Sequence, residues 1–146
     1  DECVPDAVAH LLQTLPEWFG RPESTAEYVV DAGSMETWTV RQDGEVVGAM
    51  LVHRRYAHLA EIHLIAVHRT WRGSGIGRAL VTALLDHARK HGVALLSVKT
   101  LGASDPNPDY AETRHFYERC GFLALEETAE WGEDTPCLLM VRPTSP

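Results

Sequence analysis

The stretch Arg72-Gly73-Ser74-Gly75-Ile76-Gly77-Arg78 decides the fold, because it joins two segments whose hydrophobic patterns differ. The preceding segment, Glu61–Val67, is apolar on both faces, which predicts a central strand covered on each side. In the following segment, apolar residues recur at helical spacing from Ile76 to Ala88, which predicts a long helix. A glycine-rich turn between a strand and a helix allows backbone N–H groups to converge on an anion at the helix N-terminus.

The charges around this turn also indicate an anionic ligand. Three arginines and no carboxylate lie between Arg69 and Arg78, whereas the whole chain has 13 Lys and Arg, 21 Asp and Glu and a net charge of −8. We therefore expect a phosphate-bearing ligand, with glycine needed because a Cβ would block its approach. The stretch lacks the Lys-Ser/Thr end of a Walker A motif, and its GxGxG spacing departs from the GxGxxG dinucleotide fingerprint.

The remaining pattern predicts a mixed α/β sheet in a single domain over residues 1–146. Asp43-Gly44 is typical of a hairpin turn, Gly92 and Gly121 of helix ends, and Asp109 with Glu112 of a helix cap. The predicted helices are Asp6–Leu15, Ser24–Asp31, the long helix from Ile76, and a short helix between Asp109 and Gly121. The predicted strands are Thr37–Arg41, Glu45–Tyr56, Glu61–Val67, Val93–Thr100, Phe122–Glu126 and Cys137–Arg142.

Composition excludes several classes of protein. The 146-residue chain is 45% hydrophobic and has a pI of about 5.4, which argues against a disordered chain and against nonspecific nucleic-acid binding. No apolar run is long enough to cross a membrane, and residues 1–5 carry no secretion signal, so we expect a cytoplasmic protein. The three cysteines form no CxxC pair and the histidines show no ligand spacing, so we expect no metal.

Arg72, Gly75 and Gly77 occupy the three defining positions of the motif (Q/R)xxGx(G/A), and residues 116–122 read FYERCGF. In these motifs and in element order from Asp6 to Arg142, the sequence resembles the GNAT family of N-acetyltransferases. The resemblance implies a mixed, mostly antiparallel sheet flanked by helices, with a V-shaped splay between Glu61–Val67 and Val93–Thr100. We expect the family's first strand to be short or missing here, because five residues precede Asp6 in this sequence.

The resemblance also implies acetyl-CoA as cosubstrate, held in that splay with its diphosphate on the glycine-rich stretch. Main-chain groups of the preceding strand would bind the thioester and the pantetheine arm. The implied cofactor-binding residues are Ile65, Val67, Arg72, Gly73, Ser74, Gly75, Ile76, Gly77 and Arg78.

Glu61 is the candidate general base. Transfer to an amine requires the neutral amine, whereas an alkylammonium is charged at pH 7, so a base must remove a proton. Glu61 matches the general-base glutamate of the histone acetyltransferase branch, and desolvation in an apolar strand would strengthen it as a base. The alternative is an ion pair with Arg54 or Arg55 at the wet end of the strand. His63, two residues on, is a second candidate for the base or for an acceptor contact, and its alternative is a wall residue.

Tyr117 matches the family tyrosine that hydrogen-bonds or protonates the sulfur of the coenzyme. A phenol is a weaker acid than a thiol, so we expect it to act mainly by stabilising charge. The alternative is a core residue beside Phe116. Trp18 and Trp131 are candidates to line the acceptor site. Five carboxylates between Glu126 and Asp134 could attract a cationic amine to it. A solvated charge run is the alternative for those carboxylates.

We therefore expect an acetyl-CoA-dependent N-acetyltransferase that acts by direct transfer to a small amine. A protein or peptide N-acetyltransferase is one alternative. A noncatalytic acyl-CoA-binding regulatory module, which keeps the glycine-rich stretch but has lost transfer, is the other. The sequence leaves open whether the chain forms a homodimer through its last strands.

Overall fold

The computed structural model describes Ala9, Leu11 and residues 35–71, 73–102, 108–130 and 136–145. The predicted helix Ser24–Asp31 and the question of a missing first strand lie outside these residues, and the predicted helix Asp6–Leu15 is described only at Ala9 and Leu11, both helical. The chain divides into two compact units, residues 1–53 with 62–84 and residues 54–61 with 85–146. A single domain over residues 1–146 stays a prediction.

Six described strands form one mixed, mostly antiparallel sheet in the order β1-β2-β3-β4-β6-β5, which confirms the predicted fold class. The V-shaped splay between its central strands stays a prediction. The strands are β1 (Glu36–Gln42), β2 (Glu45–Tyr56), β3 (Leu59–Val67), β4 (Leu95–Leu101), β5 (Leu123–Thr128) and β6 (Cys137–Pro143). The described helices are α4 (Ile76–Lys90), α5 (Pro108–Arg119) and the short 3-10 turn η1 (Arg69–Trp71).

In the first unit, β1 and β2 pair as an antiparallel hairpin around Asp43 and Gly44, whose φ angles are +52° and +84°. Positive φ at both positions is the geometry that makes Asp-Gly a hairpin signal. The first half of α4 packs on β2: a Cβ added to Gly48 would come within 2.5 Å of Ile76 Cγ2. The missing side chain at Gly48 therefore lets the start of α4 lie close to the sheet.

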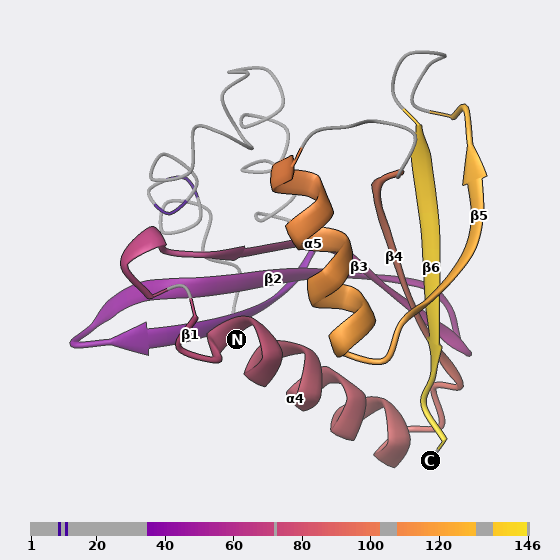
Figure 1. Cartoon of the computed structure of the whole chain (residues 1–146). Helices are drawn as coiled ribbons and strands as arrows, with labels where there is room; N and C mark the ends of the chain where they lie inside the picture. Colours follow the sequence, from indigo (N-terminus) through magenta and orange to yellow (C-terminus); the bar gives the residue numbers. More distant parts are fainter. Residues whose placement is uncertain are drawn as a thin grey trace. The chain divides into compact units, whose positions relative to one another are not determined.

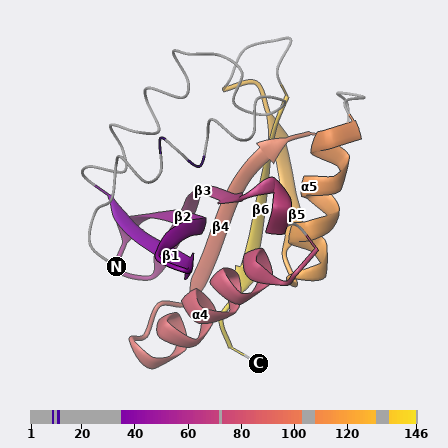
Figure 2. The same ribbon diagram turned by 90° about the vertical axis from the view of Figure 1, so that its left-hand side faces the viewer.

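In the second unit, β6 lies between β4 and β5 and pairs antiparallel with both (Figure 1). The orange helix α5 covers one face of this group and contacts β4, as the turned view in Figure 2 also shows. Gly121, at φ +89°, ends α5, and Phe122 N–H returns to Tyr117 O over 3.0 Å. This closing bond is the one expected where a left-handed glycine ends a helix.

The structure corrects two predicted boundaries. α5 begins at Pro108, so Asp109 lies in its first turn and is not the cap; proline suits the first helical position because its φ is preset and its missing N–H is not needed there. β4 begins at Leu95 because Val93 lies in the turn that closes α4, where its N–H donates to Ala88 O over 3.0 Å across the left-handed Gly92.

Candidate active site

The first unit contains the turn between β3 and α4, which we call the glycine turn (residues 73–75). At its start, His68 N–H donates to Val47 O over 2.7 Å, which ties the end of β3 to β2. Gly73 and Gly75 have φ angles of +78° and +88°, a region that side-chain-bearing residues rarely adopt. The backbone conformation therefore requires glycine at these two positions, before any ligand is considered.

The glycine turn leads directly into α4. Ala79 N–H donates to Gly75 O over 2.9 Å, so Gly75 caps the helix. The N–H groups of the first helical turn have no acceptor inside a helix, and this turn holds no acidic residue. A Cβ added to either glycine meets nothing within 4 Å, so the surface beside the turn is open. Open space, free N–H groups and the positive end of a helix dipole together suit an anion.

The predicted cofactor-binding residues around the turn differ in what their side chains do. Ser74 is exposed, and its Oγ donates to Trp71 O, which shapes the turn. Ile76 is buried and contacts the core, so only its backbone is available to a ligand. Gly77 is half-buried and Arg78 is exposed. The side chains in this group thus support the turn, and main-chain groups and Arg78 are left to meet an anion.

Residues of β3 alternate in burial as a strand with two unequal faces does. Ile62, Leu64 and Ala66 are buried, whereas His63, Ile65 and Val67 are half-buried. Because side chains alternate along a strand, His63 shares its strand face with Ile65 and Val67. The predicted pantetheine-binding residues therefore lie on the less buried face of β3.

Glu61, in the second unit, is buried and ion-paired. Arg55 Nη1 donates to Glu61 Oε2 over 3.0 Å, and the side chain of Glu61 is 8% exposed. The ion pair considered as the alternative in the sequence analysis is thus present, with Arg55 as the partner. The solvent-exposed position that the same alternative gave to Glu61 is wrong, because the carboxylate is buried. Arg55 supplies the counter-charge that a buried carboxylate needs.

Tyr117 lies on α5 and is 4% exposed. Its ring meets Phe116 and Phe122 edge to face, with centroids 5.3 and 5.7 Å apart. The packing expected of a core tyrosine is therefore observed. A role for its hydroxyl at the sulfur of acetyl-CoA stays a prediction.

Sequence reasoning missed an ion pair beside the predicted acceptor segment. Lys99 Nζ donates to Glu130 Oε2 over 3.2 Å, and Cys137 Sγ donates to Glu130 Oε1 over 3.6 Å. The hydrogen bond from Lys99 holds the pKa of Glu130 below its usual range. Lys99 is the one charged residue of strand β4. A single charge in an otherwise uncharged strand predicts an oppositely charged partner, and this was the signal available in the sequence.

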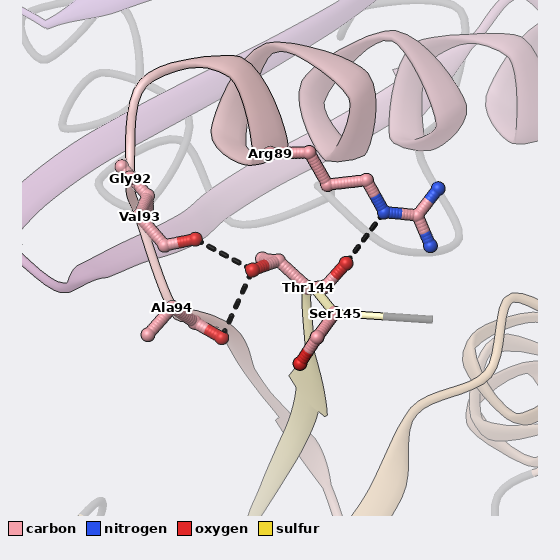
Figure 3. Close-up of a pocket in the computed structure, with 6 residues that line it drawn as sticks. All are labelled: Arg89, Gly92, Val93, Ala94, Thr144 and Ser145. Carbon is pink, nitrogen blue, oxygen red and sulfur yellow. Dashed lines mark hydrogen bonds between the residues drawn. The ribbon is translucent and has the colours of Figure 1, made fainter.

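A pocket of about 380 Å³ in the second unit lies at the end of α4 and holds none of the predicted site residues (Figure 3). Thr144 Oγ1 donates to Val93 O over 2.6 Å and to Ala94 O over 3.1 Å, and Arg89 Nε donates to Thr144 O. These bonds fasten the end of β6 to the segment between α4 and β4. Its lining residues are Arg89, Gly92, Val93, Ala94, Thr144 and Ser145.

Three predicted site residues, Arg72, Trp18 and Trp131, lie outside the described residues. Within the described part of the chain, no group of three or more His, Cys, Asp or Glu residues is arranged to hold a metal ion. None of the helices in those same ranges is long and apolar enough to cross a membrane.

A model of the acetyltransferase (GNAT) family matches residues 6–122, which include β3, the glycine turn, α4 and α5. The chain belongs to the GNAT acetyltransferase family. Members of this family use acetyl-CoA, and the openness of the glycine turn and the N-terminus of α4 suit its diphosphate. The sequence-based family resemblance is therefore confirmed.

Individual relatives show how far the likeness extends. The mycothiol acetyltransferase of Beutenbergia cavernae is 30% identical over 97 residues, which are 65% of this chain and 31% of that protein. The chain thus spans about a third of the length of this curated relative.

Two solved structures share the fold. A protein from Desulfovibrio desulfuricans assigned to the GNAT family superposes with a TM-score of 0.85 at 23% identity, covering 99% of this chain and 96% of that chain. The ribosomal-protein-S18-alanine N-acetyltransferase of Escherichia coli superposes with a TM-score of 0.77 at 22% identity, covering 97% and 88%.

Proposed function

We propose that residues 1–146 form a single acetyltransferase domain that moves the acetyl group of acetyl-CoA directly to an amine. The observation that carries this proposal is the glycine turn: two left-handed glycines, open space beside them and a helix N-terminus without acidic residues. Bound acetyl-CoA supplies an activated thioester. The turn and the first N–H groups of α4 hold its diphosphate, and Arg78 adds a positive charge beside it.

Glu61 is the proposed general base. Its carboxylate is buried and oriented by Arg55, which suits a group that must accept a proton from the acceptor ammonium directly or through one water. His63 is the second candidate for this role, since it lies two residues along β3 and is half-buried. A His63→Asn variant that retains full activity would leave the base role to Glu61 alone.

Tyr117 is proposed to stabilise the charge that develops on the sulfur of the leaving coenzyme. A phenol has a pKa near 10, against about 8.5 for a thiol, so complete proton transfer to the thiolate is unfavourable. Donation of a hydrogen bond from the hydroxyl is the contribution that this chemistry supports. The packing of the ring against Phe116 and Phe122 would keep the hydroxyl in a defined position.

We propose a small, cationic amine as the acceptor. The support is the run of five carboxylates between Glu126 and Asp134, a segment that matches acceptor-contacting regions of the family. Glu126 and Glu127 of this run are exposed on β5. Trp18 and Trp131 would give the acceptor an aromatic face.

The direct test is a thiol-release screen in which acetyl-CoA is mixed with the protein and with small amines, aminoglycosides or basic peptides. We expect release to rise with at least one small amine and the acetyl group to appear on its nitrogen by mass spectrometry. Tight binding of acetyl-CoA without release by any acceptor would overturn catalysis and favour the noncatalytic binding module. Release with basic peptides alone would overturn the small-amine acceptor.

A further inference from the structure

The 3-10 turn η1 lies between β3 and the glycine turn, and His68 stands at its start. His68 O accepts from Trp71 N–H over 2.8 Å, which is the i to i+3 hydrogen bond of the turn. The ring Nδ1 of His68 accepts from Thr70 N–H over 3.1 Å. A side chain that accepts from the second N–H of a helical turn is an N-cap, a position that Asn, Asp and Ser occupy most often. Here an imidazole caps the turn.

The capping residue is fixed to the sheet. His68 N–H donates to Val47 O over 2.7 Å, and Val47 is buried in β2. His68 itself is half-buried. The cap of η1 therefore starts from a defined point of the first unit.

Hydrogen bonds continue from η1 into the glycine turn. Trp71 O accepts from Ser74 N–H over 3.2 Å and also from Ser74 Oγ. Ser74 lies between the two left-handed glycines, Gly73 and Gly75, and Gly75 O accepts the first hydrogen bond of α4. We call this series of bonded residues the capping path, and it runs through Val47, His68, Trp71 and Ser74.

The glycine turn needs such support from its neighbours. Glycine adopts positive and negative φ about equally well, so Gly73 and Gly75 do not by themselves hold the turn in one conformation. Main-chain N–H groups that are ordered before a ligand arrives avoid the entropy cost of ordering them on binding. A side chain that fixes η1 at its start therefore favours binding at the turn that follows.

We propose that His68 is a positioning residue for the diphosphate of acetyl-CoA, because its neutral ring caps η1 and thereby holds the glycine turn in its binding conformation. This inference rests on the proposed function, since the conformation of the turn affects affinity only where the turn binds the diphosphate. The cap requires a lone pair on Nδ1, so the ring proton of neutral His68 is on Nε2. His68 transfers no proton in the reaction.

The first experiment needs no ligand. In protein labelled with ¹⁵N-histidine at pH 8, we expect Nδ1 of His68 to resonate as the unprotonated ring nitrogen and Nε2 as the protonated one. His68→Ala should speed hydrogen exchange of the Thr70 and Ser74 amides by about fivefold. His68→Asn should restore their protection, because an Asn side chain accepts from the N–H two residues on. A proton on Nδ1, or Ser74 exchange unchanged in His68→Ala, would overturn the proposal.

The second experiment compares the binding of acetyl-CoA and of S-acetylpantetheine, which lacks the diphosphate, by calorimetry. We expect His68→Ala to weaken acetyl-CoA binding by about five- to tenfold and to change the affinity for S-acetylpantetheine by less than about twofold. His68→Asn should bind acetyl-CoA within about twofold of wild type. An equal loss for both thioesters would overturn the positioning role, and so would a His68→Asn variant no better than His68→Ala.

A double-mutant cycle tests the path between His68 and the glycine turn. Ser74→Ala removes the hydroxyl that binds Trp71 O at the other end of η1. If both substitutions release the same segment, the double variant should bind acetyl-CoA only about twofold more weakly than the weaker single variant. Fully additive losses would mean that the two side chains act independently, which would overturn the proposal.

Matched variants separate this effect from loss of an imidazole or of stability. His53→Ala removes an exposed imidazole from β2 and should leave Ser74 exchange and both affinities unchanged. Gly44→Ala should lower the thermal midpoint at least as much as His68→Ala without weakening acetyl-CoA binding. If either control weakens acetyl-CoA binding as much as His68→Ala does, the effect is not specific to the cap and the proposal is wrong.

Failure of this inference differs from failure of the proposed function. If wild type prefers acetyl-CoA to S-acetylpantetheine and His68→Ala keeps that preference in full, the diphosphate site stands and the role of His68 is wrong. If wild type does not distinguish the two thioesters while the Thr70 and Ser74 amides respond as expected, the cap stands as a structural feature and the proposed site is wrong.

Discussion

The glycine turn and the charge network accommodate charge in opposite ways. The charge network consists of two ion pairs of the second unit, Arg55–Glu61 and Lys99–Glu130. The turn has two glycines, no acidic residue in the helical turn that follows, and main-chain N–H groups at the N-terminus of α4. The network has four charged side chains that already neutralise one another in pairs. The glycine turn is a site made by backbone conformation and open to an anion from outside the protein. In the charge network, each carboxylate is already neutralised by a cation of the protein itself.

This difference predicts which substitutions each region tolerates. A backbone site fails when the conformation or the space in front of it changes, whatever the charge of the surrounding side chains. A side-chain network fails when one member loses its partner, and a second substitution can restore the balance. Variants in the two regions should therefore separate binding of acetyl-CoA from the chemical step.

The largest effect is expected for Glu61→Gln, which keeps the shape of the side chain but cannot accept a proton. A general base contributes about 100- to 10,000-fold, so kcat should fall by that order while the Kd for acetyl-CoA stays unchanged. The difference in kcat between Glu61→Gln and wild type should shrink as pH rises toward the ammonium pKa of about 10.4, because free amine becomes abundant. Stopped-flow or steady-state thiol release measures this, and unchanged turnover would remove Glu61 from the mechanism.

A matched pair of glycine substitutions tests the backbone site. Gly75→Ala and Gly44→Ala both place a Cβ at positive φ with nothing within 4 Å, so each should cost about 1–2 kcal/mol of folding free energy. We expect similar falls in thermal midpoint for both variants. Only Gly75→Ala should weaken the binding of acetyl-CoA, by about tenfold, since its methyl group meets the ligand. Equal affinities of the two variants for acetyl-CoA, measured by calorimetry, would contradict the role assigned to the turn.

Tyr117→Phe tests whether a side chain contributes to the chemical step, because it removes a hydroxyl and keeps the packed ring. We expect turnover to slow by about tenfold, the equivalent of one hydrogen bond, and not to vanish. Tyr56→Phe removes the same group from a tyrosine that is 62% exposed and serves as control. Unchanged turnover in Tyr117→Phe would leave Tyr117 as a core residue only.

The smallest effect concerns Cys137, the neutral neighbour of the charge network. Burial raises the pKa of its thiol, and Glu130 adds to the rise. A folded-state pKa above the unfolded value of about 8.5 stabilises the fold below that pH, and this contribution disappears as pH rises through the folded value. The difference in unfolding free energy between wild type and Cys137→Ala should therefore narrow from pH 8 to pH 10 in urea titrations. A constant difference would contradict this assignment.

The parts of the fold set by local chemistry were predictable from sequence. The Asp43-Gly44 hairpin and the bounds of α4 followed from turn residues, a helical stripe and Gly92, each of which acts over a few neighbouring residues. The glycine turn was predictable for the same reason. The capping-box pattern predicts a cap at Asp109, whereas α5 begins one residue earlier at Pro108, whose preset φ suits the first helical position.

The ion pair Lys99–Glu130 was not predictable, because sheet pairing and a loop bring its two residues together. Lys99 and Glu130 are 31 residues apart, and sequence offered Arg54 and Arg55 equally as partners of Glu61. Sequence left open whether Glu61 is desolvated or lies at a wet strand end, since exposure depends on what covers the strand and not on its own sequence.

The central claim is that the glycine turn grips the diphosphate of acetyl-CoA through main-chain N–H groups. Calorimetric titration of acetyl-CoA against S-acetylpantetheine, which lacks that diphosphate, tests it on wild type and on Gly75→Glu. We predict that wild type binds acetyl-CoA at least about 100-fold more tightly than S-acetylpantetheine, and that Gly75→Glu abolishes the preference. Equal affinity of the wild type for both thioesters, or a preference that survives in Gly75→Glu, would contradict the claim.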